Sequence, residues 1–566
     1  MEDPMDSRDF LLRPLLNSKS NASRNSTPLN LAGLEEYTGA WTYTDAAHLL
    51  RRATFGAKKS DVITLLAKTP SQAVDMLLAS PPANTPPAPI NYVGDGAGWT
   101  STAYDSSKDN TRLAFLQSWF FSVMINQPVS INEKMVLFWM NHFSCGANAV
   151  KDARYMFKQN EMLRINALGN FRTLVKNITL DPAMLRYLNG TSNKKSAPNE
   201  NYARELQELF TIGKGPEISP GNYTNYTEAD IKAAAKVLTG WSDDATNITY
   251  KFSNGDHDSS NKQFSAAYGN TIITGKTGQT GASQEIDDLI TMILNQQATA
   301  KYIVSKIYRW FVSAEISEWI DINIITPLAD TFKQNDYEVK PVLSQLLKSA
   351  HFFDQAFKGA MVKNPVDLGI GIFRSITLDA WRDYPSAPSE LVEFLPVNTN
   401  SLHWSLRPYR RTLATMQQDL FNPPNVAGYP AYYQLPQLDQ IWINADTLQK
   451  RIKLIDDFIA IGYKWDEEYG HYIANVIEYA KLTSAPGDAA TLLNEWIVMN
   501  FPFALTDAQK TEARTFFLGT LTDNDWASMW NDYVAAPTNE EKKQAVETRL
   551  RALLRHLLGL AEYQLM

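Results

Sequence analysis

Apolar residues recur every three to four positions along most of the chain, which is the spacing that places them on one face of an α-helix. Ile286, Leu289 and Ile290 form one such group. Residues that start helices accompany the pattern. Thr227 followed by Asp230 has the spacing of a capping box, in which two side chains bond the free amides of the first helical turn. The pattern predicts a predominantly helical protein.

Further helix boundaries are predicted from individual polar residues. Ser130 followed by Glu133 also has the spacing of a capping box. Asp181 before Pro182 places a hydrogen-bond acceptor ahead of a proline at the first helical position. Gly240 stands where a C-terminal stop is expected for the helix that follows Thr227. Each of these residues predicts where a helix begins or ends.

Strand signals are rare by comparison. The least regular stretch, 242–281, is rich in Asn, Ser, Gly and Thr and predicts loops with one short hairpin. A second irregular stretch spans 422–438 and contains Pro423 and Pro424. We therefore predict a mainly α fold, a large multi-helix globular protein with irregular Asn/Gly/Pro-rich loops and at most minor β-hairpin content.

The same patterns divide the chain into three predicted parts. They are a flexible N-terminal tail over 1–40, a helical core region with the polar motifs over 41–355, and a C-terminal helical region packed on that core over 356–566. The last part closes with an amphipathic pattern over 540–566. No stretch approaches the ~20 apolar residues of a membrane-spanning helix, and residues 1–30 lack the basic and apolar segments of a secretory signal.

Composition excludes several classes of function. The net charge is -8 and no dense Lys/Arg run is present, so nucleic acid is not an expected partner. Cys145 is the only cysteine, which excludes an intramolecular disulfide and a thiolate zinc site. Gly269 and Gly275 are too far apart for a phosphate loop. The motifs of serine hydrolases, zinc proteases and dinucleotide-binding enzymes are absent.

The most informative chemistry lies in the acidic segment 199–208, which we predict to be helical. Asn201, Glu205 and Glu208 fall on one stripe beside its apolar face, whereas Arg204 projects from another side. Two partly desolvated carboxylates three positions apart need a cation. That cation is either a metal ion or a basic side chain, and two solvated acids are the third alternative. The basic candidates are Arg164, Arg172, Arg186 and Lys262.

Two histidines are further candidates for metal ligands. His142 lies on the same helical stripe as Met135 and Phe138 and is therefore expected to face the interior, where a hydrogen-bonded core histidine is the simpler alternative. His257 and Asp258 lie in the loop-rich stretch, where the alternative is a turn with a solvated histidine. Imidazole together with carboxylates suits zinc, iron or manganese.

Seven ordered motifs make the chain resemble the bacterial family catalogued as domain of unknown function 1800. They are HLLRRATFG (48–56), FWMNHF (138–143), DPAML (181–185), NENYAREL (199–206), LTGW (238–241), HD (257–258) and FNPPNVAG (421–428). The resemblance implies a protein of the cell envelope or the extracellular space. It also implies a protein partner from a family related to alkaline phosphatases and sulfatases, which is often encoded nearby.

This chain departs from the family pattern at two positions. Met140 and Phe210 stand where the family carries histidines. If those histidines are metal ligands, this member has lost part of the metal site and with it the activity.

Two hypotheses of function remain open. The first is a helical envelope or surface protein acting in protein interaction or assembly, in which a buried polar cluster holds helices in register. That cluster would contain Asn141, Asn199, Asn201, Arg204 and Arg164. The alternative is a metal-assisted hydrolase, with Glu205 or Glu208 as general base beside one divalent ion. Its ligands would be His142, Glu205, Glu208, His257 and Asp258. We favour the first, because missing histidines weaken a metal site more than a scaffold.

Overall fold

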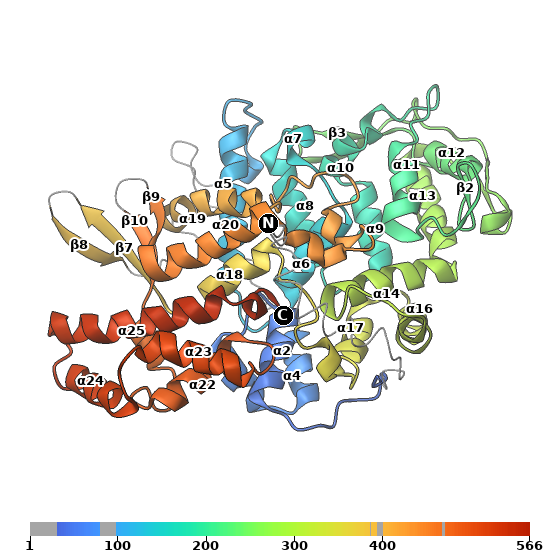
Figure 1. Cartoon of the computed structure of the whole chain (residues 1–566). Helices are drawn as coiled ribbons and strands as arrows, with labels where there is room; N and C mark the ends of the chain where they lie inside the picture. The colour runs from blue at the N-terminus through green and yellow to red at the C-terminus, as the bar shows by residue number, and fades with distance from the viewer. Residues whose placement is uncertain (1–30, 80–97, 385–386, 393–399, 467–469) are drawn as a thin grey trace, which may run out of the picture.

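The computed structural model describes residues 31–79, 98–384, 387–392, 400–466 and 470–566. Its content of 60% helix and 7% strand confirms the prediction of a mainly α fold. In Figure 1, the helices α11 to α13 lie at one end of the molecule, and the helices α22 to α25 lie at the other.

The helices follow one another along the chain, some with short connections and others with long ones. In the first part of the chain they are α2 (Tyr43–Ala53), α3 (Lys59–Leu66), α4 (Pro70–Leu77), α5 (Asp109–Asn126), α6 (Asn132–His142), α7 (Ala147–Val150), α8 (Ala153–Ile165), α9 (Phe171–Thr179), α10 (Pro182–Tyr187), α11 (Asn201–Glu205), α12 (Glu228–Val237), α13 (Gly278–Leu294) and α14 (Gln297–Phe311). They continue with α15 (Glu318–Ile320), α16 (Thr326–Gln334), α17 (Val339–Lys348), α18 (Pro365–Ser375), α19 (Asn400–Thr415), α20 (Ala445–Asp456), α21 (Val476–Ala480), α22 (Ala489–Asn500), α23 (Asp507–Leu518), α24 (Asp523–Ala535) and α25 (Glu540–Gly559).

Three further helical segments have the wider π conformation, in which each amide bonds the carbonyl five residues earlier. They are η3 (Leu206–Thr211), η5 (Asp321–Ile325) and η9 (Asp457–Ile461). Short 3₁₀ turns are η1 (Trp99–Ser101), η2 (Gly190–Ser192), η4 (Ala266–Tyr268), η6 (Gln355–Phe357), η7 (Pro430–Tyr432), η8 (Leu438–Trp442) and η10 (Ala561–Gln564).

The strands are short and antiparallel. The predicted hairpin is present, because β3 (Trp241–Asp244) pairs with β4 (Thr249–Phe252). Two smaller pairs join β1 (Glu217–Ser219) to β2 (Asn222–Tyr223) and β5 (Lys262–Gln263) to β6 (Ile272–Ile273). A four-stranded sheet that the sequence pattern did not predict has the order β8-β7-β10-β9. Its strands are β7 (Leu378–Tyr384), β8 (Ala387–Val392), β9 (Tyr463–Asp466) and β10 (Gly470–Ala474).

Most of the predicted helix boundaries are confirmed. Thr227 and Asp230 form the capping box of α12, and the Asp181 side chain accepts from the amide of Met184 at the start of α10. The capping box predicted at Ser130 is not formed, although the Ser130 hydroxyl accepts from the amide of Asn132, the first residue of α6, at 3.2 Å. Glu133 is instead buried and paired with an arginine, as described below.

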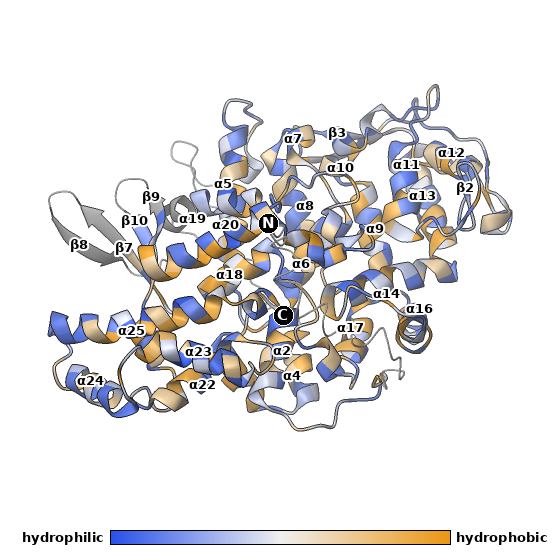
Figure 2. Ribbon diagram, in the orientation of Figure 1, coloured by the Kyte–Doolittle hydropathy of each residue, from blue (hydrophilic) through white to orange (hydrophobic). Residues whose placement is uncertain are grey.

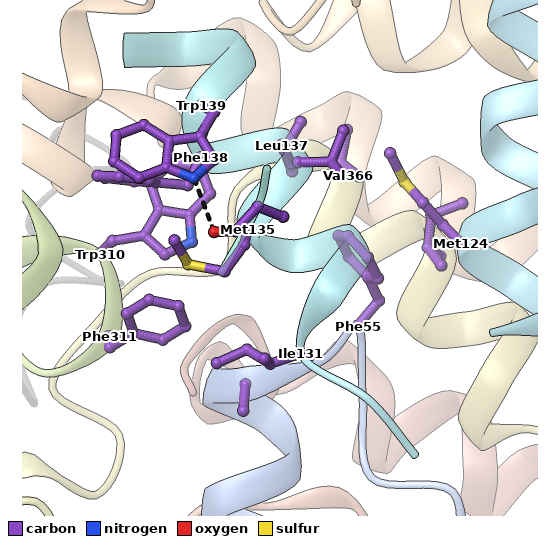
Figure 3. Packing of buried hydrophobic residues seen from close by; sticks show 14 of the residues in the cluster. Phe55, Met124, Ile131, Met135, Leu137, Phe138, Trp139, Trp310, Phe311 and Val366 are labelled. Carbon is purple, nitrogen blue, oxygen red and sulfur yellow. Dashed lines mark hydrogen bonds between the residues drawn. The ribbon is translucent and has the colours of Figure 1, made fainter. Parts of the chain in front are cut away.

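One hydrophobic core joins the regions predicted over 41–355 and 356–566. Its cluster of buried residues extends from Ala46 to Tyr563. Figure 3 shows how Met135 and Trp139 of α6 and Trp310 of α14 pack together, with Phe55 and Val366 nearby. The closing helix α25 is amphipathic as predicted, with hydrophobic and hydrophilic residues in turn along its length (Figure 2).

Backbone and side-chain bonds tie the beginning of the described chain to distant segments. The amide of Tyr37 donates to the carbonyl of Lys348 at 2.9 Å. From α2, Arg51 Nη2 donates to the Met499 carbonyl oxygen at 2.9 Å, 448 residues away in the sequence. The described part of the predicted tail, 31–40, is therefore docked on the core, while residues 1–30 lie outside the described ranges.

Within the described ranges, none of the helices combines the length and the apolar character that crossing a membrane requires.

Candidate functional site

The acidic segment is helical as predicted, but its hydrogen bonding changes halfway. α11 ends at Glu205 and the chain continues as the π segment η3. The amide of Ile212 donates to the carbonyl of Gln207, five residues earlier, at 3.2 Å, and Gly213 follows with φ of 73°. A π segment is energetically poorer than an α-helix and is often found at functional sites.

The two acids of the predicted stripe differ in their partners. Glu208 Oε1 lies 2.6 Å from Lys214 Nζ, and its Oε2 accepts from the Tyr226 hydroxyl at 3.0 Å. Glu205 forms no ion pair with the rest of the described chain. Burial, and then the charge of Glu208, raise the pKa of Glu205 to about 7. The Glu208 carboxylate is therefore neutralised by a lysine, whereas the Glu205 carboxyl group keeps its proton up to neutral pH.

The cation beside the stripe is thus a lysine that the sequence analysis did not consider. Lys214 lies just beyond the end of η3, where the chain turns back at Gly213. The four predicted basic candidates are all engaged elsewhere. Arg164 pairs with Glu133, Arg172 with Asp336, Arg186 with Asp243 and Lys262 with Glu285.

The two arginines of the predicted polar cluster each form a bidentate ion pair. Arg204 bonds the two carboxylate oxygens of Glu228 at 2.5 and 2.9 Å and so joins α11 to α12. Arg164 bonds those of Glu133 at 2.8 and 2.9 Å and joins α8 to α6. Both pairs fix helices relative to one another, which is the role that the first hypothesis assigns to them.

The asparagines of that cluster lie apart from these pairs. The Asn199 side chain accepts from the amide of Asn201 at 3.0 Å, and Asn201 is itself exposed. Asn141 accepts from the amide of Tyr429 at 3.0 Å and so anchors the irregular stretch 422–438 to α6. The five residues therefore make local contacts on several elements.

His142 faces the interior, as its helical stripe predicts. Its Nε2 donates to the carbonyl oxygen of Phe210, in η3, at 2.9 Å. Its Nδ1 is buried without a hydrogen-bond partner. Burial, and then the charge of Lys306, hold the pKa of His142 well below its ordinary value, so the ring is neutral.

Of the two residues that stand where the resemblance leads to histidines, Phe210 lies close to this ring. The centroids of the His142 and Phe210 rings are 6.2 Å apart. Met140 is two positions before His142 on the same helix, and its sulfur accepts from Asn160 Nδ2 at 3.1 Å. The phenyl ring of Phe210 therefore stands beside His142, whereas the Met140 thioether bonds a different residue.

His257 and Asp258 form a different site, beneath the β3–β4 hairpin. The ring nitrogens of His257 face the carbonyl of Thr239 at 3.0 Å and Glu285 Oε1 at 3.2 Å. Asp258 accepts from the amide and hydroxyl of Ser260, which lowers its pKa despite partial burial. These bonds hold the loop on α13.

Glu285 is the centre of this network and was missed from the sequence. It is fully buried, and it accepts from Lys262 Nζ, from His257 and from the amide of Lys276. These donors lower the pKa of Glu285, although its burial acts in the opposite direction. The sequence did indicate that Glu285 has partners. It lies next to Ile286 on the apolar side of a predicted helix, where a buried charge needs hydrogen-bond or ion-pair partners.

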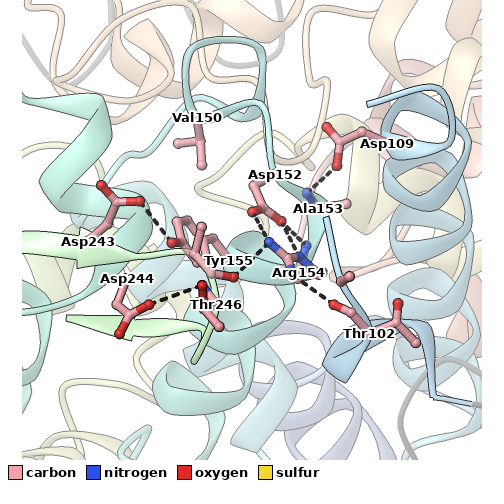
Figure 4. A network of polar contacts seen from close by, with 12 residues as sticks. Thr102, Asp109, Val150, Asp152, Ala153, Arg154, Tyr155, Asp243, Asp244 and Thr246 are labelled. Carbon is pink, nitrogen blue, oxygen red and sulfur yellow. Dashed lines mark hydrogen bonds and ion pairs between the residues drawn. The ribbon is translucent and has the colours of Figure 1, made fainter. Parts of the chain in front are cut away.

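A second buried network joins the same hairpin to α8. Arg154 Nη2 lies 2.7 Å from Asp152 Oδ2, with both side chains buried (Figure 4). The Tyr155 hydroxyl donates to Asp243 Oδ2, in β3, at 2.8 Å. This hydrogen bond and the ion pair of Arg186 with Asp243 hold β3 against α8 and α10.

The five predicted metal ligands do not form one centre. Across the residues that the structure describes, no group of three or more His, Cys, Asp or Glu side chains is arranged to hold a metal ion. The stripe acids, His142 and the pair His257 and Asp258 belong to separate contacts, as described above. The donor set present therefore does not fit a divalent ion.

A cavity of about 540 Å³ opens at the end of the acidic segment. We call it the α14 cavity, because Tyr302, Ser305, Lys306 and Arg309 of α14 line one wall. Two of the three π segments, η3 and η5, also contribute to it, through Leu209 and Asp321, and the stretch 422–438 contributes Ala427, Tyr432 and Tyr433. The Tyr302 hydroxyl donates to the Leu209 carbonyl at 3.1 Å, which couples the wall to η3.

Among the cations of this wall, Lys306 has the pKa that lies furthest below its ordinary value. Its amine lies 4.8 Å from the centroid of the Tyr302 ring. Burial, and then the neighbouring charge of Arg309, lower its pKa to about 8. The sequence analysis missed Lys306, although Tyr302, Lys306 and Arg309 have the i, i+4, i+7 spacing of one helical face.

The family described as Protein of unknown function (DUF1800) matches residues 48–565, and the chain therefore belongs to this family. No curated protein and no solved structure matches the chain.

Proposed function

We propose that this protein acts in protein interaction or assembly at the bacterial cell envelope, with the α14 cavity as its docking site. The observation that carries the proposal is a group of exposed apolar side chains on the segments that line the cavity, next in sequence to its lining residues Glu318, Asp321 and Tyr433, and we call this group the rim. Trp319 and Ile322, on the segment from α15 to η5, are 38% and 57% exposed. Tyr433 and Leu435, on the opposite stretch, are 37% and 66% exposed. Large apolar side chains around a cavity are typical of protein interaction sites.

Ion pairs within the chain support this proposal in a second way. The pairs Arg204–Glu228, Arg164–Glu133 and Lys262–Glu285 are all internal to the chain. Their charges hold helices and loops of the chain in place, which makes the fold a rigid frame. A rigid frame reduces the conformational entropy that is lost on binding.

The location and the kind of partner in this proposal rest on the resemblance of the sequence motifs. The resemblance of the motifs supports a cell-envelope or extracellular site of action. It also supports a partner from the family related to alkaline phosphatases and sulfatases. The metal-assisted hydrolase is the weaker alternative, because the predicted ligands do not gather. Elemental analysis of the purified protein tests that alternative directly.

Co-expression with the partner encoded nearby tests the proposed function. We expect the two proteins to co-purify in a fixed ratio. The double variant Trp319→Asp/Leu435→Asp should abolish co-purification, because it places charges in the apolar rim. The matched control is Ile63→Asp/Val534→Asp, which changes side chains of 55% and 56% exposure on α3 and α24. Equal capture by both double variants, or no complex with the wild-type protein, would overturn the proposal.

A further inference from the structure

Two cations of the α14 cavity lack an acidic partner. Arg309 Nε donates to the carbonyl of Ala314 at 3.3 Å, and Lys306 stacks on Tyr302. Among the described residues, no carboxylate lies within 4.0 Å of either side chain. Lys301, on the same helix, is by contrast paired with Asp321 at 2.8 Å.

The acids that line the cavity do not neutralise these cations. Asp321 is engaged by Lys301, and Glu318 forms no ion pair with Lys306 or Arg309. Two positive charges three positions apart on a helix repel each other, and desolvation increases that repulsion. A negative group placed between them would relieve it, so the wall is suited to an anion.

We propose that Lys306 and Arg309 bind the carboxylate of an acidic peptide segment that a partner protein inserts into the α14 cavity. The inference rests on the proposed function and specifies the chemistry of the partner. A guanidinium group binds a carboxylate through two parallel hydrogen bonds. Leu209, Tyr302 and Tyr433 line the same cavity and provide contacts for apolar residues next to the acid. The exposed rim extends that apolar surface beyond the cavity.

The size of the cavity fits a short segment of chain. A volume of about 540 Å³ lies within the range of ~300–1,000 Å³ that is common for ligand pockets. It accommodates two or three side chains, while the rim contacts the residues on either side. An acidic side chain flanked by aromatic or aliphatic residues therefore matches both the charge and the surface.

Two peptides differing only in charge test the inference. The probes are acetyl-Tyr-Glu-Leu-Glu-amide and its glutamine counterpart, acetyl-Tyr-Gln-Leu-Gln-amide, measured by calorimetric titration. We expect the glutamate peptide to bind at least about tenfold more tightly, since charge-assisted hydrogen bonds are roughly twice as strong as neutral ones. It should also slow the acetylation of Lys306 by acetic anhydride, followed by peptide mass mapping.

Variants assign the difference to the two cations. Lys306→Met and Arg309→Met keep an unbranched stem and should each reduce the affinity for the glutamate peptide to that for the glutamine peptide. The control Lys453→Met changes an exposed lysine of α20 that pairs with Asp457 and should leave the difference unchanged. Circular dichroism confirms that each variant is folded.

Equal affinity for the two peptides, or no binding of either, would overturn the inference. So would a difference that persists in both cavity variants. This failure is distinguishable from failure of the proposed function. If partner capture depends on Trp319 and Leu435 but not on Lys306, the docking site stands and the acidic segment does not.

Discussion

Replacing Arg164 by methionine tests whether the buried ion pairs are the frame of the fold. The guanidinium bonds Glu133 through two contacts of 2.8 and 2.9 Å. It also lies 5.1 Å from the Trp119 ring and 5.6 Å from the Phe120 ring. Methionine keeps much of the apolar stem but leaves the Glu133 carboxylate uncompensated. The exposed fractions of the two side chains are only 4% and 7%, so solvent cannot replace the lost partner.

The expected loss is about 3–5 kcal/mol in the free energy of unfolding, as for other buried pairs from which one partner is removed. Urea unfolding at pH 7, followed by circular dichroism and tryptophan fluorescence, measures it. The double variant Glu133→Leu/Arg164→Met should lose markedly less than the single variant, because no charge remains buried.

Arg555 provides the matched control. It forms the same bidentate geometry with Asp456, at 2.8 and 2.9 Å, but its side chain is 58% exposed. Arg555→Met should therefore reduce stability by no more than about 1 kcal/mol. The reasoning is refuted if Arg164→Met and Arg555→Met have similar effects, or if the double variant is less stable than Arg164→Met alone.

Two further predictions concern the acidic segment. In the folded protein the pKa of Glu205 is about 7, against 4.5 for the ordinary side chain. The free energy of unfolding therefore falls as the pH rises from 4.5 to about 7. Glu205→Gln should remove this fall in the free energy of unfolding. At pH 8 the variant should be more stable than wild type by about 1 kcal/mol, a value reduced to allow for the partial exposure of Glu205. At pH 4 the two proteins should have the same thermal midpoint. A rise of equal size at both pH values would contradict the pKa. Gly213→Ala should reduce stability by at least about 1–2 kcal/mol, because its φ is 73° and the new Cβ would lie 2.8 Å from the Tyr302 ring; an unchanged urea midpoint would contradict this.

The helical fold was predictable because its signals are local. The spacing of Ile286 and Leu289, and the capping box at Thr227, depend on residues within one or two turns of helix. The four-stranded sheet could not be predicted in this way. In its register, Ile473 pairs with Asp379, and such pairing between distant strands leaves no short-range pattern. The sequence likewise predicted that a hydrophobic core forms. It did not predict which residues near the start of the chain contact residues near its end.

The candidate site was predictable only in part. The inward orientation of His142 followed from the helical period, and the need of Glu208 for a cation followed from charge. The identity of that cation depended on the π turn, which brings Lys214 back to Glu208 and which no spacing of apolar residues predicts. Lys306 was missed for a different reason. A lysine on a helix is ordinarily solvated, and only tertiary packing places this one in a cavity.

The bond from Arg51 to the Met499 carbonyl has a consequence for synthesis. These residues are 448 positions apart, so a ribosome adding 5–20 residues per second needs roughly 20–90 s to produce the acceptor after the donor. During that interval, α2 has emerged without α22, against which it packs. Its apolar face is then open to chaperones and to aggregation. Early helices of this chain therefore depend on late ones, and a nascent fragment is expected to need protection until the C-terminal helices appear.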